Sequence, residues 1–126
     1  MNLSIEKTDQ FSTIIVEDEK LNSLNAPELK SELVVLNSQG ITNIIVDLSM
    51  VKFVDSSGLS AILIGNRLCS SSQGTFVITK LQENVLKLVK ISQLDNILHI
   101  TPTIEEARDL IVLETVERSL NDEGEE

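Results

Sequence analysis

Aromatic and basic residues are scarce in this chain of 126 residues. It has no Trp or Tyr and only three Phe, so its core must be aliphatic. The stacking platforms by which proteins usually hold single-stranded nucleic acid are therefore missing. Ten Lys and Arg stand against 20 Asp and Glu, which gives a formal net charge of −10. Because such a charge repels phosphate backbones, the composition argues against a nucleic-acid partner.

Cysteine and long apolar runs are also scarce. Cys69 is the single cysteine, so no intrachain disulfide can form. No stretch approaches the roughly 20 apolar residues of a membrane span, and the first residues lack the basic-then-apolar pattern of a signal peptide. We expect a soluble cytoplasmic protein in which Cys69 is a buried or half-buried apolar residue of a helix.

Strand-like apolar runs and apolar residues at helical spacing alternate along the chain. β-Branched runs predict strands at residues 3–8, 11–17, 41–48, 75–81 and 96–100. Apolar residues at helical spacing predict helices at residues 25–39, 57–72, 81–91 and from 103 onward. The first two strands form a hairpin. The order ββαβαβαβα predicts an α/β fold with a mixed, mostly parallel sheet covered by helices through right-handed crossovers.

Helix-capping residues predict where two helices begin, and charge predicts where the domain ends. Asn25 followed by Pro27 predicts the start of the first helix, and Thr103 with Glu106 forms the Thr-x-x-Glu pattern of a capping box. Residues 114–126 hold six acids and one Arg. We predict one domain over residues 1–113 and an acidic tail over 114–126 that is frayed or disordered.

The stretch Asp55-Ser56-Ser57-Gly58-Leu59-Ser60 follows a predicted strand and opens a predicted helix. Ligands of open α/β sheets gather where strands end and helices begin, so this junction is the candidate site. A purely structural role fits the local sequence equally well. Asp55 or Ser56 would then only cap the helix, a common device that stabilises it by about 1 kcal/mol.

A catalytic serine fits the motif poorly. A nucleophile elbow needs a Gly two residues before the serine, and this chain has Val54 or Asp55 there. The single histidine, His99, stands on a short strand between Leu98 and Ile100, where a packed or edge role is expected. The sequence shows no cluster of metal ligands and no phosphate-cradling glycine loop. We therefore expect neither enzymatic activity nor a bound cofactor.

A phosphorylated receiver domain is the second alternative. The acidic strand ends at residues 14–20 and 44–50 are similar to those of receivers. A receiver, however, needs two helices and a further strand between these points, and residues 19–43 hold one predicted helix and no spare strand. The spacing therefore disfavours this class.

A phosphate-accepting role for Ser56 has a direct physical basis. The first N–H groups of the helix that begins near Ser57 lack intrahelical partners, and the helix macrodipole places partial positive charge there. These donors would hold a phosphate on Ser56, and Gly58 would let a kinase approach closely. An added charge of about −1.5 to −2 can reverse the fit of a binding face without refolding the domain.

The motif, the element order and the length together resemble the STAS family, which includes anti-sigma factor antagonists and the cytoplasmic domains of sulfate transporters. The resemblance covers about residues 3–112 and rests on "VDLSMVKFVDSSGLS" and on "NAPELKSEL" at the start of the first helix. It implies that Ser56 accepts phosphate, with Ser57 as the alternate acceptor, and that Asp55 and Gly58 support the site. The docking face for a partner would comprise Asn25, Ala26, Pro27, Ser57 and Leu59.

In the bacterial antagonist branch of this family, the resemblance implies partner switching. The unphosphorylated protein would bind an anti-sigma factor that is also a serine kinase, phosphorylation from ATP would release it, and a serine phosphatase would restore binding. Two departures stand out: Ser60 replaces a usual second Gly, and residues 17–22 replace a Gly-Glu-(Leu/Ile)-Asp segment. The alternative is a constitutive scaffold or adaptor subunit of a stress-signalling or transport complex.

Overall fold

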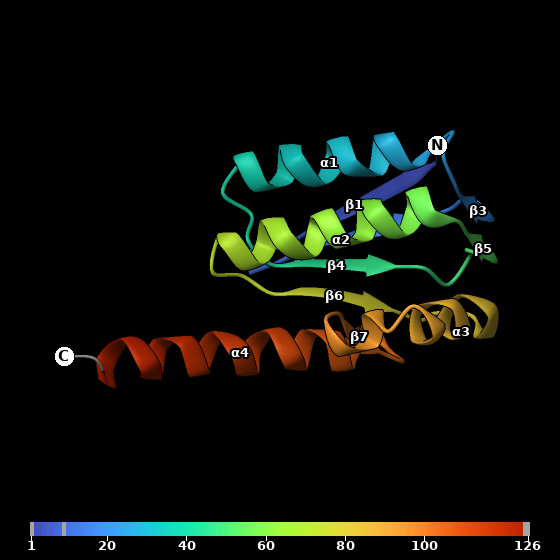
Figure 1. The fold of residues 1–126 in the computed structure, drawn as a ribbon. Coiled ribbons are helices and arrows are strands. Elements are labelled where there is room, and N and C mark those ends of the chain that lie inside the picture. The colour runs from blue at the N-terminus through green and yellow to red at the C-terminus, as the bar shows by residue number, and fades with distance from the viewer. Residues whose placement is uncertain (1, 9, 125–126) are drawn as a thin grey trace.

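The computed structural model describes residues 2–8 and 10–124, in which helices pack on both faces of a main sheet (Figure 1). The strands are β1 (Leu3–Lys7), β2 (Ser12–Val16), β3 (Lys20–Leu21), β4 (Ile44–Asp47), β5 (Phe53–Val54), β6 (Phe76–Thr79) and β7 (His99–Thr101). The helices are α1 (Ala26–Ser38), α2 (Ser56–Ser71), α3 (Glu83–Ile91), the 3₁₀ turn η1 (Leu94–Asn96) and α4 (Ile104–Gly124). The predicted α/β class and the order ββαβαβαβα are confirmed, and the short strands β3 and β5 are additional.

The main sheet has the strand order β1-β2-β4-β6-β7. β1 and β2 form the predicted antiparallel hairpin, with Ile5 opposite Ile14, and the other neighbouring strands are parallel. The register aligns Ile14 with Val46, Val46 with Ile78, and Ile78 with Ile100. Because successive side chains of a strand point to opposite faces, these residues form one aliphatic row on a single face of the sheet.

Each face of the sheet has its own core. The larger core packs Leu33 of α1 and Ile62 of α2 against Val46 of β4. The smaller core packs Ala107 of α4 against Ile45 of the same strand. Since adjacent strand residues point to opposite faces, α1 and α2 cover one face and α4 covers the other (Figure 1).

The two-residue strands β3 and β5 form a separate parallel pair. Lys20 pairs with Phe53 and Leu21 with Val54, and the Asp55 N–H extends the pairing by donating to the Leu21 carbonyl at 3.2 Å. The chain before α1 therefore lies beside the chain before α2. Strands this short have too few residues to show a period of two, so no sequence pattern predicts them.

Asn25 precedes α1 as predicted, but its side chain does not cap the helix. Its Oδ1 accepts the Asn22 N–H at 2.8 Å, and its Nδ2 donates to the Lys20 carbonyl at 2.7 Å and to an Asp18 carboxylate oxygen at 3.0 Å. The predicted capping role is therefore wrong. The Asn25 amide instead makes hydrogen bonds within the loop before α1, so it is not available to cap the helix.

α4 continues to Gly124, past the predicted end of the domain at residue 113. Glu114 accepts the buried Thr75 hydroxyl at 2.7 Å and contacts His99 Nε2 at 3.2 Å, and Arg118 donates to the same hydroxyl at 3.1 Å. These polar contacts tie the helix to the start of β6, so residues 114–124 are helical where a frayed tail was expected. Residues 125 and 126 of that tail lie outside the described residues. None of the described helices is long and apolar enough to cross a membrane.

Two local predictions are confirmed by side-chain positions. The Glu106 N–H donates to Thr103 Oγ1 at 3.1 Å, which is the expected cap of α4. Cys69 on α2 is fully buried, and this burial raises the pKa of its thiol to about 12. The thiol therefore stays protonated at neutral pH and serves as a small apolar residue.

Candidate functional site

The predicted motif lies where β5 ends and α2 begins. Asp55 is the N-cap residue of α2, and its Oδ1 accepts the Gly58 N–H at 3.0 Å. Its Oδ2 accepts the Ser23 N–H at 3.3 Å. One carboxylate thus joins the start of α2 to the loop before α1. The capping role that the sequence left open between Asp55 and Ser56 belongs to Asp55.

Ser56 is the first residue of α2, and it is exposed. Within residues 2–8 and 10–124 we find no hydrogen bond to the Ser56 hydroxyl or to the N–H groups of Ser56 and Ser57. Unsatisfied N–H groups at a helix start are anion-binding donors. The hydroxyl is therefore accessible beside free donors, whereas Ser57 is half-buried.

A hollow of about 280 Å³ lies beside Ser56, between the starts of α1 and α2. Its lining residues are Ser23, Ala26, Pro27, Lys30, Ser56, Ser57 and Ser60. Both helix N-termini direct partial positive charge toward it, and the exposed Lys30 adds a full positive charge. These groups favour an anion in the hollow, while the Asp55 carboxylate bound to Ser23 and the net charge of −10 oppose one.

The structure brings part of the predicted docking face to Ser56. Ala26, Pro27 and Ser57 line the hollow. Asn25 does not, because its amide is bound within its own loop. Leu59 is half-buried and also lies outside the lining.

Sequence reasoning missed three residues of this hollow. Lys30 follows Ala26 by four residues and Ser60 follows Ser56 by four, so helical spacing could have indicated both. Ser23 reaches the hollow through the pairing of β3 with β5, which the sequence did not reveal.

Gly58 has a different role from the predicted one. It is buried, and a Cβ placed on it would lie 2.6 Å from the Leu21 carbonyl oxygen and 2.7 Å from Val54 Cγ1. The missing side chain lets α2 pack tightly against β3 and β5. It does not open the site to a kinase, because Gly58 faces the interior.

Two exposed apolar side chains flank the site in the chain. Leu24, next to Ser23, is 87% exposed, and Phe53, two residues before Asp55, is 56% exposed. A protein partner that covers Ser56 could bury these side chains and gain the free energy of removing them from water.

Comparison with known proteins identifies the family to which this fold belongs. A family model described as the STAS domain matches residues 2–107. The chain belongs to the STAS domain family. The anti-sigma-B factor antagonist of Staphylococcus aureus is 28% identical over 107 residues, covering 83% of this chain and 98% of that protein.

Solved structures agree on the STAS fold. The protein TM1081 of Thermotoga maritima is 29% identical, with a TM-score of 0.78 over 86% of this chain and 93% of that one. The Bacillus cell fate determinant SpoIIAA, in its phosphorylated form, has a TM-score of 0.68 at 22% identity over 87% of this chain and 99% of its own. The second likeness shows the fold alone.

The imidazole of His99 contacts Glu114 and does not line the hollow beside Ser56. His99 lies on the edge strand β7, as predicted, and contacts Glu114 of α4 at 3.2 Å. It lines a different hollow from that of Ser56. In the part of the chain that the structure describes, no group of three or more His, Cys, Asp or Glu could hold a metal ion.

Proposed function

We propose that the protein is an anti-sigma factor antagonist whose binding is gated by phosphorylation of Ser56. The observation that carries this proposal is the exposed Ser56 hydroxyl at a helix start that Asp55 already caps. The unphosphorylated protein binds an anti-sigma factor that is also a serine kinase, which frees the sigma factor. Phosphorylation ends the complex, and a serine phosphatase restores the binding form.

The surface around Ser56 explains how one phosphate would act. Leu24 and Phe53 offer apolar area that a partner can bury. A phosphate of about −1.5 to −2 charge beside this area would lose its hydration in the complex, which is costly. In the free protein, the N–H groups at the start of α2 and the Lys30 ammonium stabilise the phosphate. The charge of the phosphate would therefore favour release of the partner, without a change of fold.

Transfer of phosphate from ATP tests the assignment of the acceptor. Serine kinases encoded in the same genome are incubated with ATP and the full chain, and intact mass is measured. We expect one added phosphate on the wild type and none on Ser56→Ala. Ser60→Ala, which changes another exposed serine of the same hollow, should gain phosphate normally. Loss of the phosphate in Ser57→Ala, with normal transfer to Ser56→Ala, would contradict the assignment.

The position of Lys30 predicts a measurable effect on the phosphorylated form. A nearby ammonium favours the dianion, so Lys30→Gln should raise the second pKa of phosphoserine 56 by about 0.5 unit. A ³¹P NMR titration measures this pKa directly. Lys87→Gln, on an exposed position of α3 away from the hollow, is the matched control. Equal titration curves for the two variants would show that Lys30 does not contact the phosphate.

A further inference from the structure

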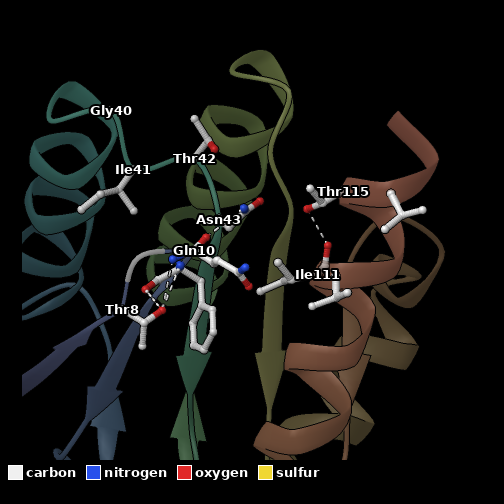
Figure 2. A pocket seen from close by; sticks show the side chains of 11 residues that line it. Thr8, Gln10, Gly40, Ile41, Thr42, Asn43, Ile111 and Thr115 are labelled. Atoms are coloured by element: carbon white, nitrogen blue, oxygen red, sulfur yellow. Dashed lines mark hydrogen bonds between the residues drawn. The ribbon is translucent and has the colours of Figure 1, made fainter. Parts of the chain in front are cut away.

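A second surface lies on the opposite face of the sheet from α1 and α2. A groove of about 460 Å³ runs between α4 and the loops that precede β2 and β4, where Figure 2 shows Ile41 and Ile111 on its two sides. Ile111 is buried, and Phe11 and Ile41 are half-buried. Val112 and Val116 complete its apolar lining, and they are 51% and 50% exposed.

The apolar lining continues onto the outer surface of α4. Leu113 and Leu120 are 55% and 60% exposed. At 3.6 residues per turn, Val112, Val116, Leu120 and Leu113 fall within an arc of about 100°, on the side opposite Ala107, which packs on the sheet. The outward side of a surface helix is normally polar. We call these four residues and the groove together the α4 surface.

The acidic residues of α4 indicate which kind of partner would bind the α4 surface. Residues 104–126 contain nine acids and two Arg, a net charge of −7. Glu105, Asp109 and Glu117 are exposed on α4 beside the apolar stripe. The two arginines are already engaged: Arg108 lies 5.6 Å from the centre of the Phe11 ring, and Arg118 donates to Thr75. A complementary partner must therefore be apolar at its centre and basic around it.

The same charges argue against two other occupants. Pairing two copies through α4 would bring two helices together that each hold seven acids against two Arg, a net charge of −5, and like charges in contact oppose association. An anionic membrane surface attracts basic segments and repels acidic ones.

We propose that the α4 surface docks a basic amphipathic helix of a partner protein. Three apolar side chains at positions i, i+3 and i+7 of that helix would contact the groove and the stripe, and Lys or Arg around them would face the acids of α4. This inference goes beyond the function proposed above. α2 separates the two sites, because it starts at Ser56 and ends near Gly74, which packs on Thr42 of the groove. At 1.5 Å per residue this helix spans about 24 Å.

Two synthetic peptides test the proposal. They share leucines at i, i+3 and i+7 and carry either lysines or glutamates elsewhere, and fluorescence anisotropy measures their binding to the full chain. We expect the lysine peptide to bind at least tenfold more tightly than the glutamate peptide. The double variant Leu113→Ser, Leu120→Ser should weaken it at least tenfold at unchanged protein charge. Ile91→Ser, at an apolar position of α3 that is 76% exposed, should leave it unchanged.

Equal affinity for the two peptides, no binding of either, or an unaffected double variant would overturn the proposal. Light scattering coupled to size exclusion examines the second-copy alternative, and phosphatidylglycerol vesicles examine the membrane alternative. A dimer or a vesicle complex that the double variant abolishes would assign the surface to that occupant instead. Ser56→Glu should bind the lysine peptide like the wild type, since the two sites are separate, and this result is independent of whether Ser56 is phosphorylated.

Discussion

Replacing Gly58 with alanine is expected to lower the free energy of unfolding by about 3 kcal/mol. A methyl group at this position would lie 2.6 Å from the Leu21 carbonyl oxygen. That oxygen cannot move freely, because it accepts the Asp55 N–H at 3.2 Å within the paired segments β3 and β5. The new methyl group therefore forces α2 away from β3 or breaks the pairing. Chemical denaturation with circular dichroism measures the loss.

Ser60→Ala is the matched control for this substitution. Ser60 is exposed two residues farther along α2, so alanine adds no clash and should change the stability by about 0.5 kcal/mol or less. The Gly58 variant should also bind the partner less well, because its distortion moves Ser23 and Leu24. Equal stability of the Gly58 and Ser60 variants would show that α2 does not depend on this close contact.

The second large effect is expected for Ser56→Asp. Under the proposed function, we expect its affinity for the anti-sigma factor to fall about 100-fold, or about 3 kcal/mol, because a carboxylate within the covered surface would lose its hydration on binding. The fold should be unaffected, since an acidic residue in the first turn of a helix interacts favourably with the dipole. Titration calorimetry with the purified anti-sigma factor measures the change.

Two measurements make this result decisive. Ser60→Asp places the same charge one turn farther along α2 in the same hollow, so it should weaken binding less than Ser56→Asp. The enzymatically phosphorylated protein should bind at least as weakly as Ser56→Asp. Unchanged affinity of both the phosphorylated protein and Ser56→Asp would rule out gating by charge at this position.

The regular elements could be predicted from sequence because each carries its own period. β-Branched residues 44–46 form a buried strand, and Leu29, Leu33 and Leu36 repeat along the buried face of α1. Local capping chemistry predicted a helix start near Ser57, one residue after the observed start of α2 at Ser56, and the start after Thr103. These signals are contained within a few neighbouring residues, so no tertiary information was needed.

The details of the site depend on contacts between segments far apart in sequence. Asp55 binds Ser23, 32 residues earlier, and Gly58 packs on Leu21 through two strands too short to show a pattern. The extension of α4 depends in the same way on the distant hydroxyl of Thr75, 39 residues before Glu114. The acidic composition of residues 114–126 predicted a frayed segment. Composition could not reveal that Thr75 binds this part of the chain.

The hollow where α1 and α2 both begin combines two helix N-termini and Lys30 with the adjacent Asp55 carboxylate. The helix-end charges act only within the first turn, whereas the net charge of −10 acts over a distance of about 8 Å at physiological salt. The net negative charge therefore opposes the approach of a small dissolved anionic phosphodonor. Under the proposed function, the phosphoryl group would therefore reach Ser56 from an enzyme bound to this surface, so modification would require a macromolecule that recognises the domain.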